Sequence, residues 1–173
     1  MLVCNHVSFV DALVVTAACR RPVRFIRYHK IFSIPVMSFV FRTSRAIPIA
    51  PRNKDEALIH KAFDDVAAAL EHGDVMGIFP EGMITHTGDM NEFKNRVEKI
   101  VERTPVPVVP LALKGLWGSF FSRDNGSAMS HPKRLFTRFW SRIELVAGSV
   151  VPAEDVCAGR LEVSVRELRG DRR

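Results

Sequence analysis

Apolar and polar residues follow two patterns along the chain, namely short apolar runs and longer segments with helical spacing. The clearest helix is predicted over Asp55–His72, where apolar residues recur on one helical face. These residues are Ile59, Phe63, Val66 and Leu70. Gly73 follows directly and predicts the end of that helix. Short apolar runs predict strands over Leu2–Cys4, Val23–Tyr28, Ala46–Ala50, Val75–Phe79, Val106–Leu113 and Arg142–Val146.

Further segments with helical spacing lie between these strands. They predict helices over Phe9–Cys19, Ile34–Arg42, Glu92–Arg103 and Leu161–Leu168. Strands that alternate with helices indicate an α/β fold with a mostly parallel sheet flanked by helices. The sequence holds no repeat, low-complexity tract or Gly/Ser linker, so we expect residues 1–173 to form a single domain.

The composition excludes several classes of protein. With 47% hydrophobic and 25% charged residues among 173, the chain is neither disordered nor fibrous. Its longest apolar stretches, Ala12–Cys19 and Ile34–Phe41, are shorter than the roughly 20 residues that span a bilayer. The three cysteines form no CxxC pair and predict neither a disulfide framework nor a zinc site. A net charge of +6 favours an anionic partner such as lipid, an acidic carrier or nucleic acid.

Polar motifs follow three of the predicted strands directly. They are Asn5-His6, Pro51-Arg52 and Pro80-Glu81-Gly82. Ligands of open α/β sheets bind in the crevice outside the carboxyl ends of the strands. We therefore expect the three motifs to share one crevice.

The segment from Asn5 to Asp11 allows two interpretations. In a continuous helix, His6 and Asp11 would lie about 7.5 Å apart along the axis and about 140° apart around it. If His6 instead lies in the turn before the helix, with Ser8 as the N-cap, Asp11 is the third helical residue and reaches the imidazole. Such a pair can act as a general base. Alternatively, Ser8 and Asp11 form only a capping box, and His6 is an ordinary turn residue.

The other two motifs also have a plain alternative. Phe79-Pro80-Glu81-Gly82 is a good tight turn after a buried strand, or it presents Glu81 and an accessible backbone at the crevice. Arg52 is an isolated surface cation or a ligand for a phosphate group. Neither motif decides its own role.

Taken together, the order and spacing of the motifs resemble the glycerophospholipid acyltransferase family, whose members include lysophosphatidate acyltransferases. The matching segments are Asn5–Asp11, Ile47–Arg52, Phe79–Gly82 and Val106–Pro110. More narrowly, the chain is similar to the acyltransferase part of 2-acylglycerophosphoethanolamine acyltransferases. That similarity rests on Phe41–Ala50, Glu81–Thr85 and Leu116–Arg123.

The resemblance implies the transfer of a fatty acyl group from acyl-CoA or acyl-ACP to the hydroxyl of a lysophospholipid. His6 would be the general base and Asp11 would orient it, with no metal and no bound cofactor. Substrate binding is implied for Asn5, Ser8, Arg52, Phe79, Pro80, Glu81 and Gly82. A lipid acceptor implies contact with a membrane, at its cytoplasmic face, as a peripheral protein or as part of a larger membrane protein.

The sequence departs from the family pattern in three places. Met83-Ile84 stands where many members have Thr-Arg, and Arg52 lies three residues after Ile49 instead of two. The first predicted strand begins at Leu2, so we expect the chain to lack the family's N-terminal segment. These departures leave the phosphate ligands undecided.

Two other functions explain some of the same features. A basic module that binds lipid surfaces without catalysis would account for the net charge and for the cations and aromatic residues of Lys133–Arg142. The same segment also suits a docking site for an acyl carrier or a solvated face. A thioester hydrolase would use the His6/Asp11 pair with water. No motif typical of nucleic-acid binding is present.

Overall fold

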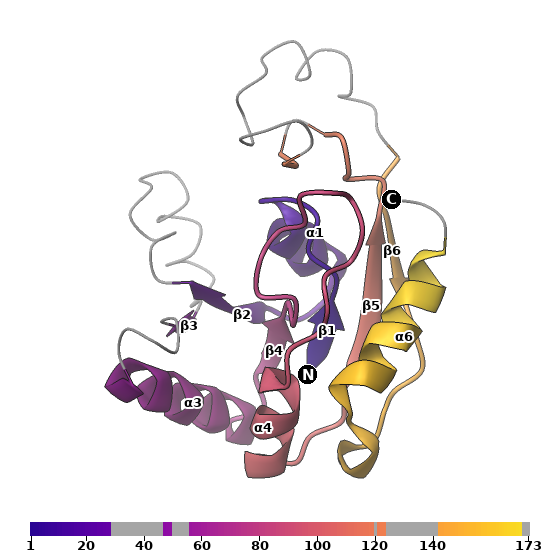
Figure 1. Cartoon of the computed structure of the whole chain (residues 1–173). Helices are drawn as coiled ribbons and strands as arrows, with labels where there is room; N and C mark the ends of the chain where they lie inside the picture. The colour runs from indigo at the N-terminus through magenta and orange to yellow at the C-terminus, as the bar shows by residue number, and fades with distance from the viewer. Residues whose placement is uncertain (29–46, 50–55, 120, 124–141, 171–173) are drawn as a thin grey trace.

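The computed structural model describes residues 1–28, 47–49, 56–119, 121–123 and 142–170. These residues form a six-stranded sheet in the order β3-β2-β4-β1-β5-β6 (Figure 1). All neighbouring strands pair in parallel except β5 and β6, which are antiparallel. The predicted α/β fold with a mostly parallel sheet is therefore confirmed. The strands are β1 (Leu2–Cys4), β2 (Val23–Tyr28), β3 (Ile47–Ile49), β4 (Val75–Ile78), β5 (Val109–Lys114) and β6 (Glu144–Ala147).

Helices cover both faces of the sheet, because successive side chains of each strand point to opposite faces. Val3, Met76 and Ala112 belong to one core cluster, which includes residues of α3 (Glu56–Glu71), α4 (Arg96–Arg103) and α6 (Ala158–Arg169). Cys4, Phe25 and Leu113 belong to a second cluster, which includes residues of α1 (Asp11–Ala18). A short 3-10 helix, η2 (Ala153–Asp155), precedes α6.

The pairing of the central strands positions the polar motifs. In β1, Val3 pairs with Ile78 of β4 on one side, and Cys4 pairs with Leu111 of β5 on the other. Since these strands run in parallel, β1 and β4 end side by side. Asn5-His6 and Phe79–Gly82 therefore leave the sheet at the same edge, as the strand-end rule predicts.

Helix α4 is shorter than the predicted segment Glu92–Arg103 and begins at Arg96. Backbone N–H groups just before α4 donate to acceptors outside the helix. The N–H of Phe93 donates to Glu162 Oε2 at 2.9 Å, and the N–H of Lys94 donates to the carbonyl of Pro80 at 3.1 Å. The first N–H groups of a helix have no acceptor within it, so these two bonds do not by themselves exclude a longer helix; they fix the loop that leads into α4.

The remaining helix ends differ less from the predictions. Helix α3 ends before Gly73, whose φ of 84° favours glycine, as the sequence predicts. Helix α6 starts three residues earlier than predicted, at Ala158, whose N–H donates to Glu98 Oε1. The predicted helix Ile34–Arg42 and almost all of Lys133–Arg142 lie outside the described residues.

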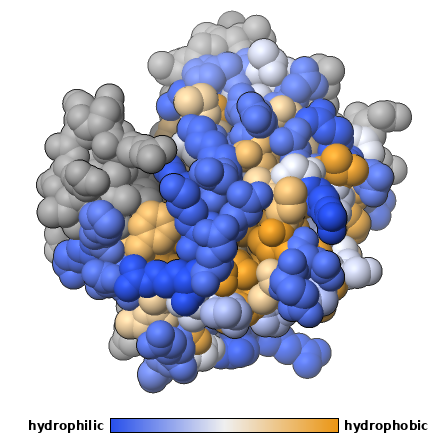
Figure 2. Space-filling model, turned by 60° about the horizontal axis from the view of Figure 1, so that its bottom comes forward, coloured by the Kyte–Doolittle hydropathy of each residue, from blue (hydrophilic) through white to orange (hydrophobic). Residues whose placement is uncertain are grey.

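Polar residues cover most of the surface seen in Figure 2, and apolar residues show between them in small areas. None of the described helices combines the length and the apolar character needed to cross a bilayer.

Candidate active site

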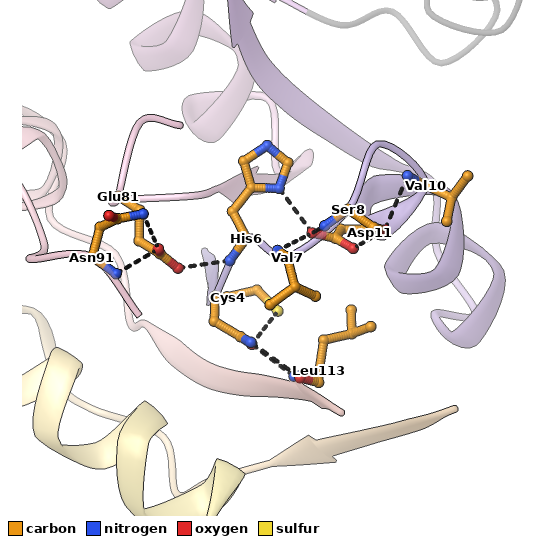
Figure 3. Close-up of polar contacts among 10 residues, drawn as sticks. Cys4, His6, Val7, Ser8, Val10, Asp11, Glu81, Asn91 and Leu113 are labelled. Atoms are coloured by element: carbon orange, nitrogen blue, oxygen red, sulfur yellow. Dashed lines mark hydrogen bonds and ion pairs between the residues drawn. The ribbon is translucent and has the colours of Figure 1, made fainter. Parts of the chain in front are cut away.

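The side chain of Asn5 fixes the chain where it leaves β1. It is fully buried, and its amide pairs with the backbone of Leu113 in β5 (Figure 3). The Leu113 N–H donates to Asn5 Oδ1 at 2.7 Å, and Asn5 Nδ2 donates to the Leu113 carbonyl at 3.0 Å. These two bonds continue the pairing of β1 with β5, with the Asn5 side chain in place of a backbone. They fix the position at which the turn with His6 begins.

His6 and Asp11 form a hydrogen-bonded pair in that turn. His6 Nδ1 lies 2.8 Å from Asp11 Oδ2, and the His6 side chain is 14% exposed, whereas Asp11 is fully buried. The second ring nitrogen, Nε2, has no hydrogen bond within the described part of the chain and points away from Asp11 (Figure 3). The pair therefore has the geometry of an imidazole with one nitrogen fixed by a carboxylate and the other open.

Asp11 also holds the turn together. Its Oδ2 accepts the N–H groups of Val7 and Ser8 at 2.7 and 2.9 Å, and its Oδ1 accepts the Ser8 hydroxyl at 2.5 Å. The carboxylate thus acts only as an acceptor, as an ionised carboxylate does. The same carboxylate therefore makes two predicted contacts. It bonds the His6 ring, as the pair interpretation requires, and it accepts the Ser8 N–H, as one of the two bonds of a capping box.

The predicted role of Ser8 as the N-cap is wrong. Helix α1 begins at Asp11 with Val10 as its N-cap, so Asp11 is the first helical residue and not the third. Ser8 is kept out of the helix because its backbone forms an antiparallel bridge with Ser122, and the Phe9 N–H donates to the Phe121 carbonyl at 3.1 Å. The Ser8 hydroxyl donates to Asp11 and accepts only the Val10 N–H, at 3.3 Å.

Glu81 fixes the backbone of His6 from the neighbouring strand. Its carboxylate is buried, and Oε1 accepts the His6 N–H at 2.7 Å. Oε2 accepts the backbone N–H and the side-chain Nδ2 of Asn91, at 2.8 and 2.9 Å. Burial raises the pKa of the Glu81 carboxyl, and the hydrogen bonds from Asn91 and His6 offset part of that shift. Asn91 was not predicted, because a loop residue ten positions after Glu81 carries no pattern.

The imidazole of His6 stacks on Phe79, which in turn stacks on Phe25. The His6 and Phe79 rings are stacked, with centroids 4.2 Å apart and an interplanar angle of 11°, and Phe25 stacks on Phe79 at 5.1 Å. Phe25 occupies the space over Gly77 in β4, where a Cβ atom would lie 2.5 Å from the Phe25 ring. The ring of His6 is therefore oriented both at its edge, by Asp11, and on its face, by Phe79.

The Phe79–Gly82 segment is a tight turn at the crevice. The Gly82 N–H donates to the Phe79 carbonyl at 3.0 Å, and the φ of Gly82 is 74°, which favours glycine. Two nearby loops also contact the His6 turn, since the Thr85 N–H donates to the His6 carbonyl at 3.0 Å and Phe9 bonds Phe121. The motif is therefore a tight turn as predicted, but it does not present Glu81 to a ligand, because that side chain is 1% exposed and its two oxygens accept hydrogen bonds from His6 and Asn91.

The carboxyl edge of β1 and β4 brings together most of the residues predicted for the site. These residues are Asn5, His6, Ser8, Asp11, Phe79, Pro80, Glu81 and Gly82. Arg52 lies outside the described residues. The substrate-binding roles stay predictions, although the polar groups of Asn5 and Glu81 are already engaged by protein. Among the described residues, no three His, Cys, Asp or Glu side chains gather where they could hold a metal ion.

The Acyltransferase family model matches residues 1–114, which include β1 to β5 and the four motif segments Asn5–Asp11, Ile47–Arg52, Phe79–Gly82 and Val106–Pro110. The chain belongs to the acyltransferase family. This acyltransferase chain is 29% identical over 116 residues to the chloroplastic 1-acyl-sn-glycerol-3-phosphate acyltransferase BAT2 of Brassica napus, covering 65% of the chain and 32% of that protein. It is 28% identical over 116 residues to the chloroplastic 1-acyl-sn-glycerol-3-phosphate acyltransferase LPAT1 of Arabidopsis thaliana, covering 65% of the chain and 31% of that protein.

The acyltransferase chain thus spans about a third of the length of the curated relatives it matches. Its fold is similar to the crystal structure of the 1-acyl-sn-glycerophosphate acyltransferase PlsC from Thermotoga maritima. The TM-score is 0.68 at 19% sequence identity, and the match covers 96% of this chain and 63% of that one. At this identity the similarity bears on the fold alone.

Proposed function

We propose that this chain transfers a fatty acyl group from a thioester of coenzyme A or acyl carrier protein to the free hydroxyl of a lysophospholipid. The observation that carries the proposal is the His6–Asp11 pair at the strand ends, with Nε2 of His6 pointing away from Asp11 (Figure 3). The names of the two plant relatives make 1-acyl-sn-glycerol 3-phosphate the first acceptor to test, and 2-acylglycerophosphoethanolamine the second.

In the proposed reaction, His6 Nε2 removes the proton of the acceptor hydroxyl while its oxygen attacks the thioester carbonyl. The new C–O bond forms, the C–S bond breaks, and the imidazolium returns the proton to the leaving thiolate. Asp11 holds Nδ1–H and stabilises the imidazolium charge. General-base assistance of this kind contributes about 10²–10⁴ in rate.

The surrounding residues serve this step by fixing His6 before the substrate arrives. Glu81 holds the His6 N–H, Phe79 holds its ring face, and Asn5 holds the strand end. Ser8 supports Asp11 through its hydroxyl. We propose that the glycerophosphate of the acceptor contacts Gly82, Pro80 and Arg52. Because the acceptor is a lipid, we also propose that the protein works at a membrane surface on the cytoplasmic side, as a peripheral protein or as part of a larger membrane protein.

The test is an acyl-transfer assay with the purified chain. Radiolabelled acyl-CoA and acyl-ACP are supplied with a panel of lysophospholipids, and His6→Ala is measured beside His72→Ala, whose side chain is 82% exposed. We expect diacyl product from the unaltered chain and from His72→Ala, and a loss of about 10²-fold or more in His6→Ala.

Two results would contradict the proposal. Product formation that survives in His6→Ala would remove His6 from the chemistry. Release of free fatty acid at the same rate with and without a lysolipid would identify a thioester hydrolase that uses the same pair.

A further inference from the structure

We propose that Arg123, held by His86 and Phe9, binds a phosphate group of a substrate next to the His6–Asp11 pair. This inference rests on the proposed transfer between phosphate-bearing substrates. It assigns a role to a residue that lies outside the strand-end motifs.

Two loops bring Arg123 to the catalytic turn. The loop after β4 is attached through the Thr85 N–H, which donates to the His6 carbonyl, and the loop after β5 is attached through the Phe121 carbonyl, which accepts the Phe9 N–H. The loops also pack on each other, because the Trp117 ring covers Gly88, where a Cβ atom would lie 2.7 Å from the indole. Arg123 and His86 are therefore placed by the same contacts that hold His6.

The guanidinium of Arg123 is oriented by two neighbours. Its Nη1 lies 2.9 Å from His86 Nε2, which can accept this bond when the imidazole is neutral. Its Cζ lies 5.6 Å from the centroid of the Phe9 ring, within the range of a cation–π contact. Phe9 belongs to the turn between β1 and α1 that also carries His6, so the guanidinium contacts that turn.

Among the described residues, His86 is the one acceptor of a hydrogen bond from the Arg123 guanidinium. Within residues 1–28, 47–49, 56–119, 121–123 and 142–170, no salt bridge joins Arg123 to a carboxylate, and the residue is only partly buried. A guanidinium has five N–H donors in a planar fork, and the bond to His86 uses one of them. A phosphate group takes two such donors at once, which is the geometry that favours arginine over lysine.

The main competing place for an anion is the groove beside the Phe79–Gly82 turn. It is lined by Lys94 and Arg96, and the ammonium of Lys94 lies 3.2 Å from where a Cβ atom of Gly82 would be. Glu92 and Glu162 line the same groove, so its charge is mixed. Arg123 is the better anion ligand because its described neighbours are an imidazole and an aromatic ring.

Binding without turnover tests the inference directly. Glycerol 3-phosphate, which carries the acceptor's phosphate, and coenzyme A, which carries the donor's, are titrated by calorimetry into the chain and into Arg123→Ala, Arg123→Lys and Arg160→Ala. Arg160 is the matched control, since α6 packs on the opposite face of the sheet. We expect Arg123→Ala to weaken binding of one of the two probes roughly ten- to a hundredfold. Arg123→Lys should lose less, and Arg160→Ala should bind as the unaltered chain does.

The probe whose binding is weakened in Arg123→Ala shows whether Arg123 binds the phosphate of the acceptor or of the donor. Steady-state kinetics then test that assignment. An acceptor site predicts a rise in KM for the lysophospholipid in Arg123→Ala, and a donor site predicts a rise in KM for acyl-CoA. Unchanged binding of both probes in a folded Arg123→Ala, or no binding of either probe to the unaltered chain, would overturn the inference. Because no acyl transfer is needed, loss of the proposed activity and loss of this site are observed separately.

Discussion

At the residue scale, four contacts fix His6, and within the described part of the chain its ring nitrogen Nε2 has no hydrogen bond. Asp11 bonds Nδ1, Phe79 stacks on the ring, Glu81 accepts the backbone N–H, and Thr85 donates to the carbonyl. A side chain fixed in this way loses little entropy when the substrate binds, so it can be held in the reactive geometry in advance.

The sequence predicted only part of this arrangement. The spacing of His6 and Asp11 allowed their contact but did not decide it, and the pair was expected only from the family resemblance. The partners of Glu81 could not be predicted, because the Asn91 amide and the His6 N–H reach it through loop conformation and strand order. Arg123 was visible only as part of a family resemblance, since a lone cation carries no periodic signal.

The thiol of Cys4 gives the folded chain a stability that depends on pH. Burial raises its pKa well above 9.0, and the charges of Asp11 and Glu81 raise it further. Between 9.0 and the folded-state value, the unfolded chain releases this proton and the folded chain keeps it. Stability therefore falls as pH rises above 9.0, by at most about 1.4 kcal/mol per pH unit from this group.

Urea unfolding at pH 7, 9 and 10 checks this contribution. In Cys4→Ala, the free energy of unfolding should fall less between pH 9 and 10 than in the unaltered chain. Cys157→Ala is the matched control, because Cys157 is exposed and should leave the slope unchanged. Parallel losses in Cys4→Ala and the unaltered chain would show that the thiol contributes nothing.

At the scale of the element, two strands have the predicted bounds, whereas β5 starts at Val109 instead of the predicted Val106 and the starts of α1, α4 and α6 also differ from the predictions. Leu2–Cys4 and Val23–Tyr28 have the predicted bounds, because a short apolar run in a buried parallel strand needs no other signal. The start of α1 depends on the bridge between Ser8 and Ser122, which is far away in the sequence. Strand order was not predicted either, since each parallel crossover can pass to more than one neighbour.

Strand β4 supports the active site through the absence of a side chain at Gly77. Gly77→Ala would place a Cβ atom 2.5 Å from the Phe25 ring and displace the stack that carries Phe79 and His6. We expect a loss of about 1–3 kcal/mol in stability, the usual cost of overpacking. The rate constant kcat should fall further than the loss of folded chain explains, because the His6 ring loses its support.

Gly159→Ala is the matched control, since nothing lies within 4 Å of a Cβ atom at that position in α6. It should keep kcat and slightly raise the melting temperature, as replacing glycine in a helix does. A Gly77→Ala chain with normal kcat and normal stability would show that the Phe25 stack does not hold His6.

At the scale of the whole molecule, the sheet separates the proposed active site around His6 from the larger of the two core clusters. The His6 ring stacks on Phe79 of the α1 side, whereas the larger cluster lies on the other face beneath α3, α4 and α6. Mutations in that larger cluster should change the fraction of folded chain without changing the site.

Leu161→Ala tests this separation. Leu161 is 1% exposed and packs in the larger cluster, so its truncation should cost about 2–5 kcal/mol. Val163→Ala, at a position on the same helix that is 55% exposed, should cost little. Chemical denaturation measures both changes, and the KM for each substrate should be unchanged in the folded fraction. A shifted KM in Leu161→Ala would mean that the two faces are coupled.

The bonds between Asn5 and Leu113 join residues that are 108 positions apart. Protein synthesis delivers Asn5 first, and until the segment containing Leu113 has left the ribosome, the β5 side of β1 has no partner. Contacts of such long range are slow to form, and unpaired strand edges invite aggregation. The turn that carries His6 is therefore made long before the strand that completes its support.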